Sequence, residues 1–382
     1  MQKLETFASA VAEICSHSLV VPERPLRWTI IANPKAGGFT INSRWKKHRV
    51  ALEDALDRAK KNPRRGDAGP SGPPDENNGF GLVPTTGPGH AGKIVSALLD
   101  AGNTEDAGKA ANVGNVGNAG KADPFYLVIT AGGDGTSLEV LQALFSAPPE
   151  QRSRFAVLRL PMGTGNDGAD SPDLSKALDL LVNPSRPEKT GGVRLSTASG
   201  KTWPDGNPFL AFNILSIGLD AFVTHMTNKM KGKFPGDSYK LWVDIASLLY
   251  DRIYRVGALS VKGYDARGGE VMNLRERLLL CAMGASGRRS YGAQKKILPD
   301  DRNVCMVKQM SLFRKLAIKG RFTSGNHILM PESIMGNAAK LVIDGENPIL
   351  AQMDGEAVLL EKEDFPLVIE LTEKTIQKLT GV

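Results

Sequence analysis

The sequence has only three cysteines, Cys15, Cys281 and Cys305, and they lie far apart. Their spacing fits neither a metal-binding motif nor a disulfide framework, so we expect a reducing compartment. Long hydrophobic runs are also missing: none approaches the roughly 20 residues that a membrane-spanning helix needs. The start lacks a basic-then-apolar signal pattern. We therefore expect a cytoplasmic protein that touches a membrane, if at all, peripherally at its inner surface.

What the chain does have is length and positive charge. Its 382 residues are enough for two domains, and the formal net charge is +7. A basic balance favours anionic partners such as nucleotides, acidic membrane surfaces or nucleic acids, without choosing among them. No nucleic-acid-binding module or interleaved aromatic stripe is present, so nucleic acid is not an expected partner.

The chain is organised around the stretch Ala131-Gly-Gly-Asp-Gly-Thr136. The apolar residues 125–130 before it predict a buried strand, and the spacing of apolar residues over 137–145 predicts a helix. Thr136 and Glu139 have the spacing of a capping box. Glycines between a strand and a helix allow a phosphate to approach the backbone. Two glycines alone would fit a turn without a ligand, but Asp134 favours a nucleotide site with Mg²⁺ or a proton transfer.

Two further glycine-rich turns follow predicted strands. Asn33-Pro-Lys-Ala-Gly-Gly38 comes after residues 27–32, and Pro161-Met-Gly-Thr-Gly-Asn-Asp-Gly168 comes after residues 155–160. Thr85 precedes a third glycine-rich helix start. Each turn alone could be ordinary turn chemistry, but open α/β sheets bind ligands at the carboxyl ends of their strands. The repetition favours one composite nucleotide site.

The pattern of elements predicts an α/β domain followed by a β-rich domain. We expect the first domain at 1–190, with residues 363–382 returning to it and ending in a short helix. The second domain is expected at 191–362, with strands near 256–262, 277–284, 303–309 and 340–344. Residues 62–81 and 101–122 are rich in glycine, proline or charge, and we predict that both are flexible insertions. The apolar face of residues 4–15 favours docking on the first domain over a membrane-surface helix.

In this context the chain resembles the diacylglycerol kinase catalytic-domain family, which includes bacterial lipid kinases, sphingosine kinases and ceramide kinases. Gly-Gly-Asp-Gly alone is shared with NAD kinases and phosphofructokinases, whereas the 163–167 motif favours lipid kinases. The motifs that carry the resemblance are Asn33-Pro-Lys-Ala-Gly-Gly38, Thr85 with Gly89-His-Ala91, Gly132-Gly-Asp-Gly-Thr136, Gly163-Thr-Gly-Asn-Asp167, Ser216-Ile-Gly-Leu-Asp-Ala221, Ser290-Tyr-Gly292 and Asp354-Gly-Glu356.

The resemblance implies a Rossmann-like N-terminal α/β domain, a C-terminal β-sandwich domain that takes the lipid, and ATP between them. It implies Glu356 as the general base, with Asp134 as Mg²⁺ ligand or as the alternative base. The residues implied for the nucleotide are Asn33, Pro34, Lys35, Ala36, Gly37, Thr85, Gly132, Gly133, Asp134, Gly135, Thr136, Ser137, Leu138, Gly163, Thr164, Asn166 and Asp167.

The chain departs from the family pattern in two places. Leu138 stands where the family usually has asparagine, which removes a polar contact near the phosphates. A longer acidic loop that binds a structural Mg²⁺ in many bacterial members is shortened here to Leu298-Pro-Asp-Asp-Arg302. Asp300 and Asp301 are its remaining candidate ligands, and Arg302 would repel a cation.

The predicted function is an ATP-dependent lipid kinase that phosphorylates a diacylglycerol-like or sphingosine-like hydroxyl. The alternatives are an NAD kinase and a non-catalytic nucleotide- or lipid-binding regulator on the same fold. Lys229, Lys231 and Lys233 suggest contact with an anionic membrane or a solvated charged face. The acceptor lipid and the oligomeric state, a homodimer included, stay open.

Overall fold

A computed structural model of the chain divides it into two units, Met1–Thr190 with Lys374–Val382, and Gly191–Glu373. In the part of the chain that the structure describes, no helix combines the length and the apolar character needed to cross a bilayer. The described residues are 2–64, 81–111, 124–163, 166–230, 250, 254, 257–292 and 295–382.

The first unit is built on a six-stranded sheet in the order β2-β1-β3-β4-β19-β5. All neighbours run parallel except β19 and β5. Its elements are α1 (Gln2–Ser16), β1 (Leu26–Ala32), α2 (Gly37–Thr40), α3 (Asn42–Ala59), β2 (Gly81–Pro84), α4 (His90–Ala111), β3 (Phe125–Gly132), α5 (Asp134–Ser146), α6 (Pro149–Arg152), β4 (Phe155–Pro161), α7 (Leu174–Val182), β5 (Ser185–Thr190) and β19 (Ile376–Gly381).

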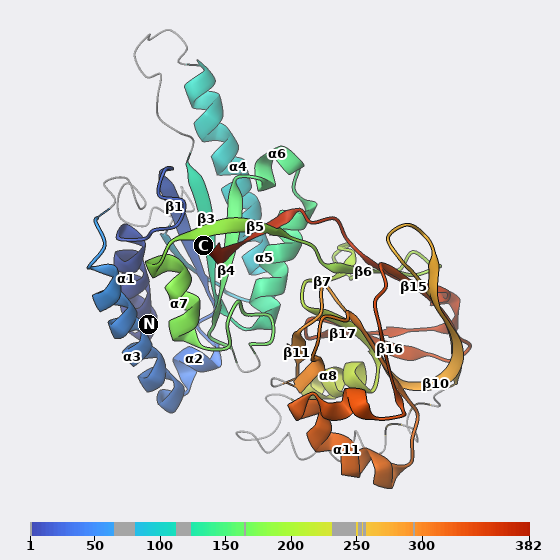
Figure 1. Cartoon of the computed structure of the whole chain (residues 1–382). Coiled ribbons are helices and arrows are strands. Elements are labelled where there is room, and N and C mark those ends of the chain that lie inside the picture. Colours follow the sequence, from blue (N-terminus) through green and yellow to red (C-terminus); the bar gives the residue numbers. More distant parts are fainter. Residues whose placement is uncertain are drawn as a thin grey trace. The chain divides into compact units, whose positions relative to one another are not determined.

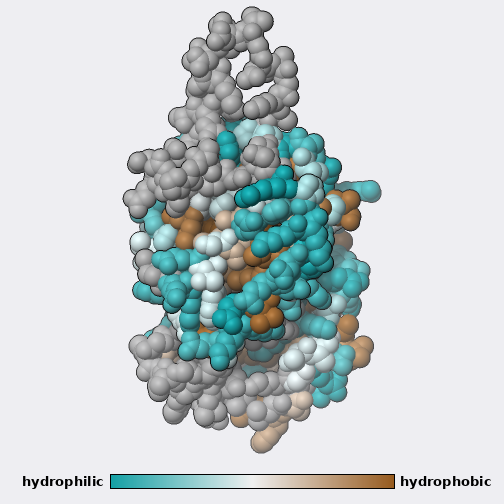
Figure 2. Space-filling view, turned by 90° about the vertical axis from the view of Figure 1, so that its left-hand side faces the viewer, coloured by the Kyte–Doolittle hydropathy of each residue, from teal (hydrophilic) through white to brown (hydrophobic). Residues whose placement is uncertain are grey.

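Helices cover both faces of this sheet. In Figure 1, α1, α3 and α7 lie on one face, and α4 and α5 lie on the other. A strand covered on both sides must be apolar throughout, and β3 and β4 are indeed buried along their whole lengths. Helix α1 buries Phe7, Val11 and Ile14 in the same core, as its apolar face predicted. Much of the outward surface in this region is hydrophilic (Figure 2).

The second unit is organised by an antiparallel sheet of eleven strands with the main order β17-β16-β8-β10-β9-β15-β18-β6-β7, to which β13 and β14 add at β10. Its elements are β6 (Val193–Ser196), β7 (Phe209–Ala211), β8 (Ile214–Gly218), α8 (Leu219–Met230), β9 (Ala258–Tyr264), β10 (Glu270–Gly284), β11 (Arg289–Tyr291), β12 (Lys295–Leu298), β13 (Val304–Lys308), α11 (Leu312–Ser324), η1 (Asn326–Leu329), β14 (Ser333–Gly336), β15 (Lys340–Asp344), β16 (Ile349–Met353), β17 (Glu356–Leu360), η2 (Lys362–Asp364) and β18 (Leu367–Leu371).

Strand β10 joins the two parts of this sheet. Residues 270–277 pair with β9, whereas residues 278–284 pair with β8 and β13. Burial changes at the same point, because the seven residues from Leu278 to Gly284 are all buried. The predicted α/β fold class, with a parallel sheet first and a large antiparallel sheet second, is confirmed.

Three expectations about the chain's course were wrong. The last segment is strand β19, not a helix, because its backbone pairs with β4 on one side and β5 on the other. The chain returns to the first unit at Lys374 rather than at 363, since β18 pairs with β15 and β6 in the second unit. Residues 101–111 continue helix α4, for which their alanines are well suited. The remainder of that insertion, and residues 65–80 of the other, lie outside the described residues.

Candidate functional site

Loops after four neighbouring strands of the first unit carry its sequence motifs. Because β2, β1, β3 and β4 are adjacent and parallel, the loops that follow them meet at one edge of the sheet. Backbone hydrogen bonds connect these segments: Asn33 N donates to Ala131 O at the end of β3 at 3.0 Å, Thr85 N to Ala32 O at the end of β1 at 2.7 Å, and Gly38 N after β1 to Met162 O after β4 at 2.8 Å.

The loop after β1 is shaped by Asn33. Its side-chain oxygen accepts a hydrogen bond from Lys35 N at 2.9 Å, and its carbonyl accepts one from Ala36 N at 3.0 Å. This Asx turn leaves the Lys35 side chain exposed and leads into α2. Gly38 is needed for close packing, because a Cβ there would lie 2.9 Å from the carbonyl oxygen of Met162.

The loops after β3 and β4 touch through their glycines. A Cβ on Gly163 would lie 2.5 Å from the Cα of Gly133, closer than real Cβ atoms approach. Asn166 closes its own loop, because its side-chain oxygen accepts from Gly163 N at 2.6 Å and its φ of 58° is left-handed. The two motifs therefore form one continuous backbone surface.

The side chain of Asp134 makes a second contact between the same two loops. Its Oδ1 accepts a hydrogen bond from Gly168 N at 2.8 Å. Gly168 follows directly after Asp167, so both carboxylates belong to these joined loops. Thr164, which the sequence analysis also assigned to the nucleotide, lies outside the described residues.

The first turn of α5 differs from its prediction. The helix begins at Asp134 after Gly133, and no side chain caps it, so the Thr136–Glu139 capping box was wrong. Thr136 instead fills the space beside Gly132, where a Cβ would lie 2.6 Å from its Oγ1. The side chains of Ser137 and Leu138 are buried, at 7% and 4% exposure. An uncapped helix N-terminus offers N–H groups and a dipole that favour an anion.

Glu139 has a role that the sequence did not reveal. Its carboxylate accepts hydrogen bonds from Gly89 N at 2.7 Å and from Ala91 N at 3.0 Å. It thereby caps the start of α4 and fixes the loop that carries Thr85 against α5. The sequence showed only a threonine before a glycine-rich helix start, which does not point to Glu139.

A buried ion pair supports the end of the loop after β4. Arg159 Nη2 lies 2.8 Å from Asp170 Oδ1, and their side chains are 8% and 4% exposed. Arg159 N also donates to Asp170 Oδ2 at 2.7 Å. A Cβ on Gly168 would lie 3.8 Å from Arg159 Nη1 and 3.3 Å from Asp134 Oδ1, so the guanidinium lies close to the Asp134 contact. An arginine inside an otherwise apolar strand was the signal for this pair.

The carboxylates of these loops are suited to a Mg²⁺ ion that is bound together with nucleotide phosphates. Among the described residues, no group of three or more His, Cys, Asp or Glu side chains could hold a metal. Mg²⁺ in kinase sites usually keeps several waters and takes one or two carboxylates with the substrate phosphates. Asp134 and Asp167, on joined loops, supply carboxylates of that kind.

The acidic loop of the second unit is arranged differently from a metal site. Arg302 Nε lies 3.1 Å from Asp300 Oδ2, and Arg288 Nε lies 2.6 Å from Asp301 Oδ1. The hydrogen bond from Arg302 lowers the pKa of Asp300, and that from Arg288 lowers the pKa of Asp301. Two guanidinium groups already balance the two carboxylates, which does not favour a cation here.

The Asp354-Gly-Glu356 motif forms the tight turn between β16 and β17. Asp354 and Gly355 have φ of 47° and 103°, as a two-residue hairpin turn requires. The buried Asp354 carboxylate accepts hydrogen bonds from the backbone N–H groups of Phe212 at 2.5 Å, Asn213 at 3.1 Å and Ile214 at 2.9 Å. The turn is thus held rigidly, and it presents Glu356 at the surface as the first residue of β17.

The other two motifs of the second unit lie beside this turn. Gln352 donates to Ser216 Oγ at 2.8 Å and accepts from Gly355 N at 3.1 Å, and Ser216 Oγ donates to Asp220 at 2.8 Å. Asn213 donates to the carbonyl of Ser290 at 2.9 Å. The 216–221, 290–292 and 354–356 motifs therefore form one polar cluster.

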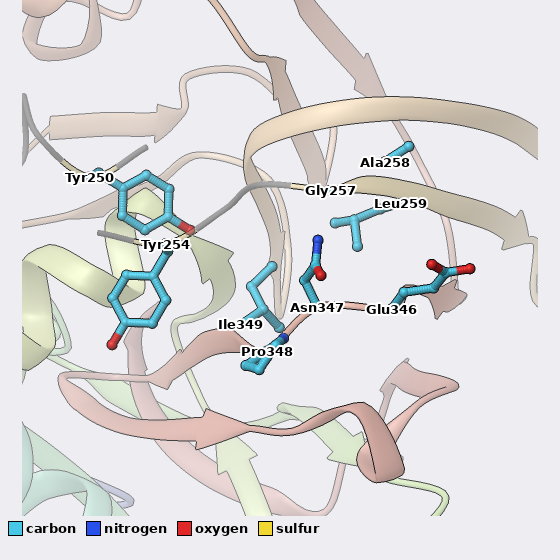
Figure 3. Close-up of a pocket in the computed structure, with 9 residues that line it drawn as sticks. All are labelled: Tyr250, Tyr254, Gly257, Ala258, Leu259, Glu346, Asn347, Pro348 and Ile349. Carbon is cyan, nitrogen blue, oxygen red and sulfur yellow. The ribbon is translucent and has the colours of Figure 1, made fainter. Parts of the chain in front are cut away.

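A small pocket of the second unit lies away from that cluster. Figure 3 shows the rings of Tyr250 and Tyr254 on one side, and Asn347, Pro348 and Ile349 among the residues opposite them. Burial and the nearby carboxylate of Glu361 raise the pKa of Tyr254. The pocket adjoins the first residue of β16, whereas the Asp354 turn follows its last, so the five-residue strand separates them.

Comparison with known proteins agrees with these motifs. Residues 27–188 match the family model of the diacylglycerol kinase catalytic domain. A YegS-like protein of Cronobacter sakazakii, named as a lipid kinase, is 28% identical over 169 residues, which are 44% of this chain and 50% of that protein. The chain thus matches about half the length of this curated relative.

The fold has a counterpart among solved structures. A Bacillus anthracis protein assigned as a diacylglycerol kinase aligns with a TM-score of 0.53 and 17% identity, over 92% of this chain and 96% of that one. This likeness concerns the fold. The family match covers residues 27–188, and the solved structure has a similar fold over most of the chain.

Proposed function

We propose that the protein is an ATP-dependent lipid kinase, which transfers the γ-phosphate of ATP to a hydroxyl group of a diacylglycerol-like or sphingosine-like lipid. The observation that carries the proposal is the union of the Gly132–Thr136 and Gly163–Asp167 motifs on adjacent strands. Their glycines touch, and Asp134 bonds to Gly168. The family match of residues 27–188 and the name of the YegS-like relative support it.

In this proposal the first unit binds the nucleotide through its backbone. The N–H groups of the uncapped α5 N-terminus donate to phosphate oxygens, the glycines let the phosphates approach the backbone, and Lys35 adds a positive charge. Thr85, held in place through Glu139, lies near the nucleotide. Asp134 and Asp167 would hold Mg²⁺, which supplies charge neutralisation at the phosphates when bound.

The second unit supplies the base. Glu356 accepts the proton of the lipid hydroxyl as that oxygen bonds to the γ-phosphorus and the bond to ADP breaks. Asp354 and Gln352 act as positioning residues, since they fix the turn that carries Glu356. The assignment to Glu356 leaves Asp134 as the alternative base.

The test is transfer of labelled phosphate from ATP to a panel of diacylglycerol, monoacylglycerol, sphingosine, ceramide, undecaprenol and NAD. We expect transfer to one lipid class, with Asp134→Asn and Glu356→Gln each lowering kcat by about 10²-fold or more. Exposed residues on each unit give matched controls, Asp57→Asn and Glu373→Gln, and these should act like wild type.

Each result has a defined consequence. Wild-type turnover in Asp134→Asn would refute the proposal. Phosphorylation of NAD rather than lipid would establish the NAD kinase alternative. Tight ATP binding without transfer to any acceptor would establish a regulator, for which Leu138 is the motivating departure. Of Asp134→Asn and Glu356→Gln, the variant with the larger loss of kcat identifies the base.

A further inference from the structure

The most exposed apolar surface of the second unit lies on α11 and η1. Phe313 and Leu329 are 83% and 76% exposed, and Leu312 is 40% exposed. Among the large hydrophobic side chains of the described residues, only Val382, at the end of the sequence, is more exposed than Phe313. Phe313 is also the one aromatic residue in that exposed group. An apolar patch kept in contact with water points to a binding surface.

After α11 ends, the chain runs back along the helix, so Leu329 lies between a contact to its last turn and a contact to its first. Ser311 caps α11 by accepting from Arg314 N at 3.4 Å, and Leu312 and Phe313 lie in the capped first turn. After Gly325 the chain reverses, and Arg314 Nε bonds to Glu332 at 2.8 Å. Glu332 lies three residues after Leu329, so this contact places the segment after η1 beside the first turn of α11.

The inward side of the same segment is firmly packed. His327 is fully buried, and its ring stacks on Phe322 at 4.4 Å between centroids. The Nε2 atom of His327 lies 3.1 Å from the carbonyl of Ile297. The exposure of Phe313 and Leu329 is therefore a feature of an ordered element rather than of a frayed end.

The cations near the patch are in excess, because the carboxylates of Glu332, Asp300 and Asp301 are each bonded to an arginine. Residues 311–330 contain four lysines and arginines and no aspartate or glutamate. Strand β12, which packs against α11, adds Lys295 and Lys296. Glu332 balances Arg314, whereas Arg321 and Lys296 are exposed. Apolar side chains flanked by cations complement an anionic lipid surface, where the former enter the acyl boundary and the latter meet phosphates.

We propose that α11 and η1 form a docking surface for anionic lipid bilayers, which we call the α11 patch: Leu312, Phe313, Leu329, Lys296 and Arg321. Phe313 and Leu329 insert into the interfacial region, and Lys296 and Arg321 lie among the head groups. The proposal goes beyond the kinase assignment, since it concerns how the second unit meets a membrane and does not depend on the nucleotide loops.

The experiment is flotation of the full chain with vesicles of phosphatidylcholine alone or mixed with phosphatidylglycerol. We expect binding to the anionic vesicles that weakens with salt. The double variant Phe313→Gln/Leu329→Gln should lower the partition coefficient by roughly tenfold or more. Val50→Gln and Val271→Gln, which remove side chains 61% and 50% exposed elsewhere, are the matched controls and should bind as wild type does.

Two further measurements separate the outcomes. Arg321→Gln/Lys296→Gln should weaken binding to the anionic vesicles only. Phosphate transfer to an acceptor dispersed in detergent should be unchanged in the Phe313→Gln/Leu329→Gln variant, so a failure of the kinase assignment leaves the vesicle result intact. Equal binding of that variant and wild type, or equal binding of wild type to neutral and anionic vesicles, would overturn the proposal. The proposal would also be overturned if wild type forms a dimer and the Phe313→Gln/Leu329→Gln variant does not, because the patch would then bind a second copy of the chain.

Discussion

The two units build their candidate sites from different materials. In the first unit the candidate site is mostly backbone: glycines at the ends of parallel strands touch, and the N-terminus of α5 has no side-chain cap. In the second unit the site is made of side chains, and the backbone serves to hold them, as the three N–H groups around Asp354 show. Anion binding needs close backbone approach, whereas proton transfer needs a carboxylate in a fixed position.

The sheet types explain this division. Parallel strands end at a common edge, so loops distant in sequence gather there and can share a ligand. An antiparallel pair is closed by a tight turn, and β16 and β17 place Asp354 and Gly355 in that turn and Glu356 next to it. The following predictions test whether the first site requires glycines, which have no side chain, and whether the second requires the carboxylate side chains of Asp354 and Glu356.

The largest effect is expected from Gly163→Ala. The added Cβ would meet the Cα of Gly133 at 2.5 Å, and a backbone atom cannot swing aside as a side chain can. We expect a loss of about 1–3 kcal/mol in unfolding free energy and loss of nucleotide binding, measured by denaturation and by calorimetric titration with ATP. Gly381→Ala is the control, because a Cβ there meets nothing within 4 Å. Wild-type ATP affinity in Gly163→Ala would contradict the backbone-built site.

A smaller but selective effect is expected from Asp354→Asn. An amide has one accepting oxygen, and its NH₂ group would face N–H donors, so it cannot accept all the hydrogen bonds that the carboxylate receives from Phe212, Asn213 and Ile214. We expect about 1–2 kcal/mol lower unfolding free energy together with a lower kcat, measured by urea denaturation and phosphate transfer.

Two other variants sharpen that result. Glu356→Gln removes an exposed carboxylate, so it should lower kcat with little change in stability. Asp205→Asn alters an exposed turn carboxylate that bonds to Asn207 N at 3.1 Å, and it should change stability by about 0.5 kcal/mol or less. Equal stability of Asp354→Asn and Asp205→Asn would show that the buried turn does not depend on its charge.

The smallest effect concerns acid pH. Burial lowers the pKa of His327 below its usual 6.5. The unfolded chain then binds a proton that the native state does not, so stability falls as the pH drops below about 6.5. Burial, with Lys47 and Arg44, also lowers the pKa of the partly exposed His48 in the first unit.

Urea denaturation from about pH 7.5 to about pH 5.5 measures this dependence. We expect His327→Phe to flatten the slope more than His48→Gln, because His327 is the fully buried member of the pair. A slope left unchanged by His327→Phe would show that this buried imidazole does not couple folding to pH.

Much of the first unit could be predicted from local patterns. The apolar runs at 125–130 and 155–160 are strands β3 and β4, and each is followed by the glycine-rich turn that was expected there. Such signals survive because a strand buried on both faces must be apolar along its length. The second domain was predicted to be rich in strands, as it is, and the predicted strand at 340–344 coincides with β15.

The failures share one physical cause. The capping box at Thr136 looked sufficient locally, yet Glu139 bonds to Gly89 and Ala91, which lie about fifty residues earlier. The sequence already indicated that Arg302 would repel a cation at Asp300 and Asp301, and the structure adds that Arg302 and Arg288 bond to these carboxylates. The last segment has no strong helical or strand pattern in its sequence, and its conformation is set by pairing with β4 and β5.

The sequence by itself determined which segments are strands covered on both faces, where glycine allows close approach, and which motifs carry the family resemblance, because these depend on residue type and short-range periodicity. Only the tertiary structure decided the partners of the charged groups, namely Glu139, the Arg159–Asp170 pair and the Asp354 carboxylate. A charge in a fold is stabilised by whatever donor or counter-charge packing brings to it, and that donor need not be near it in the sequence.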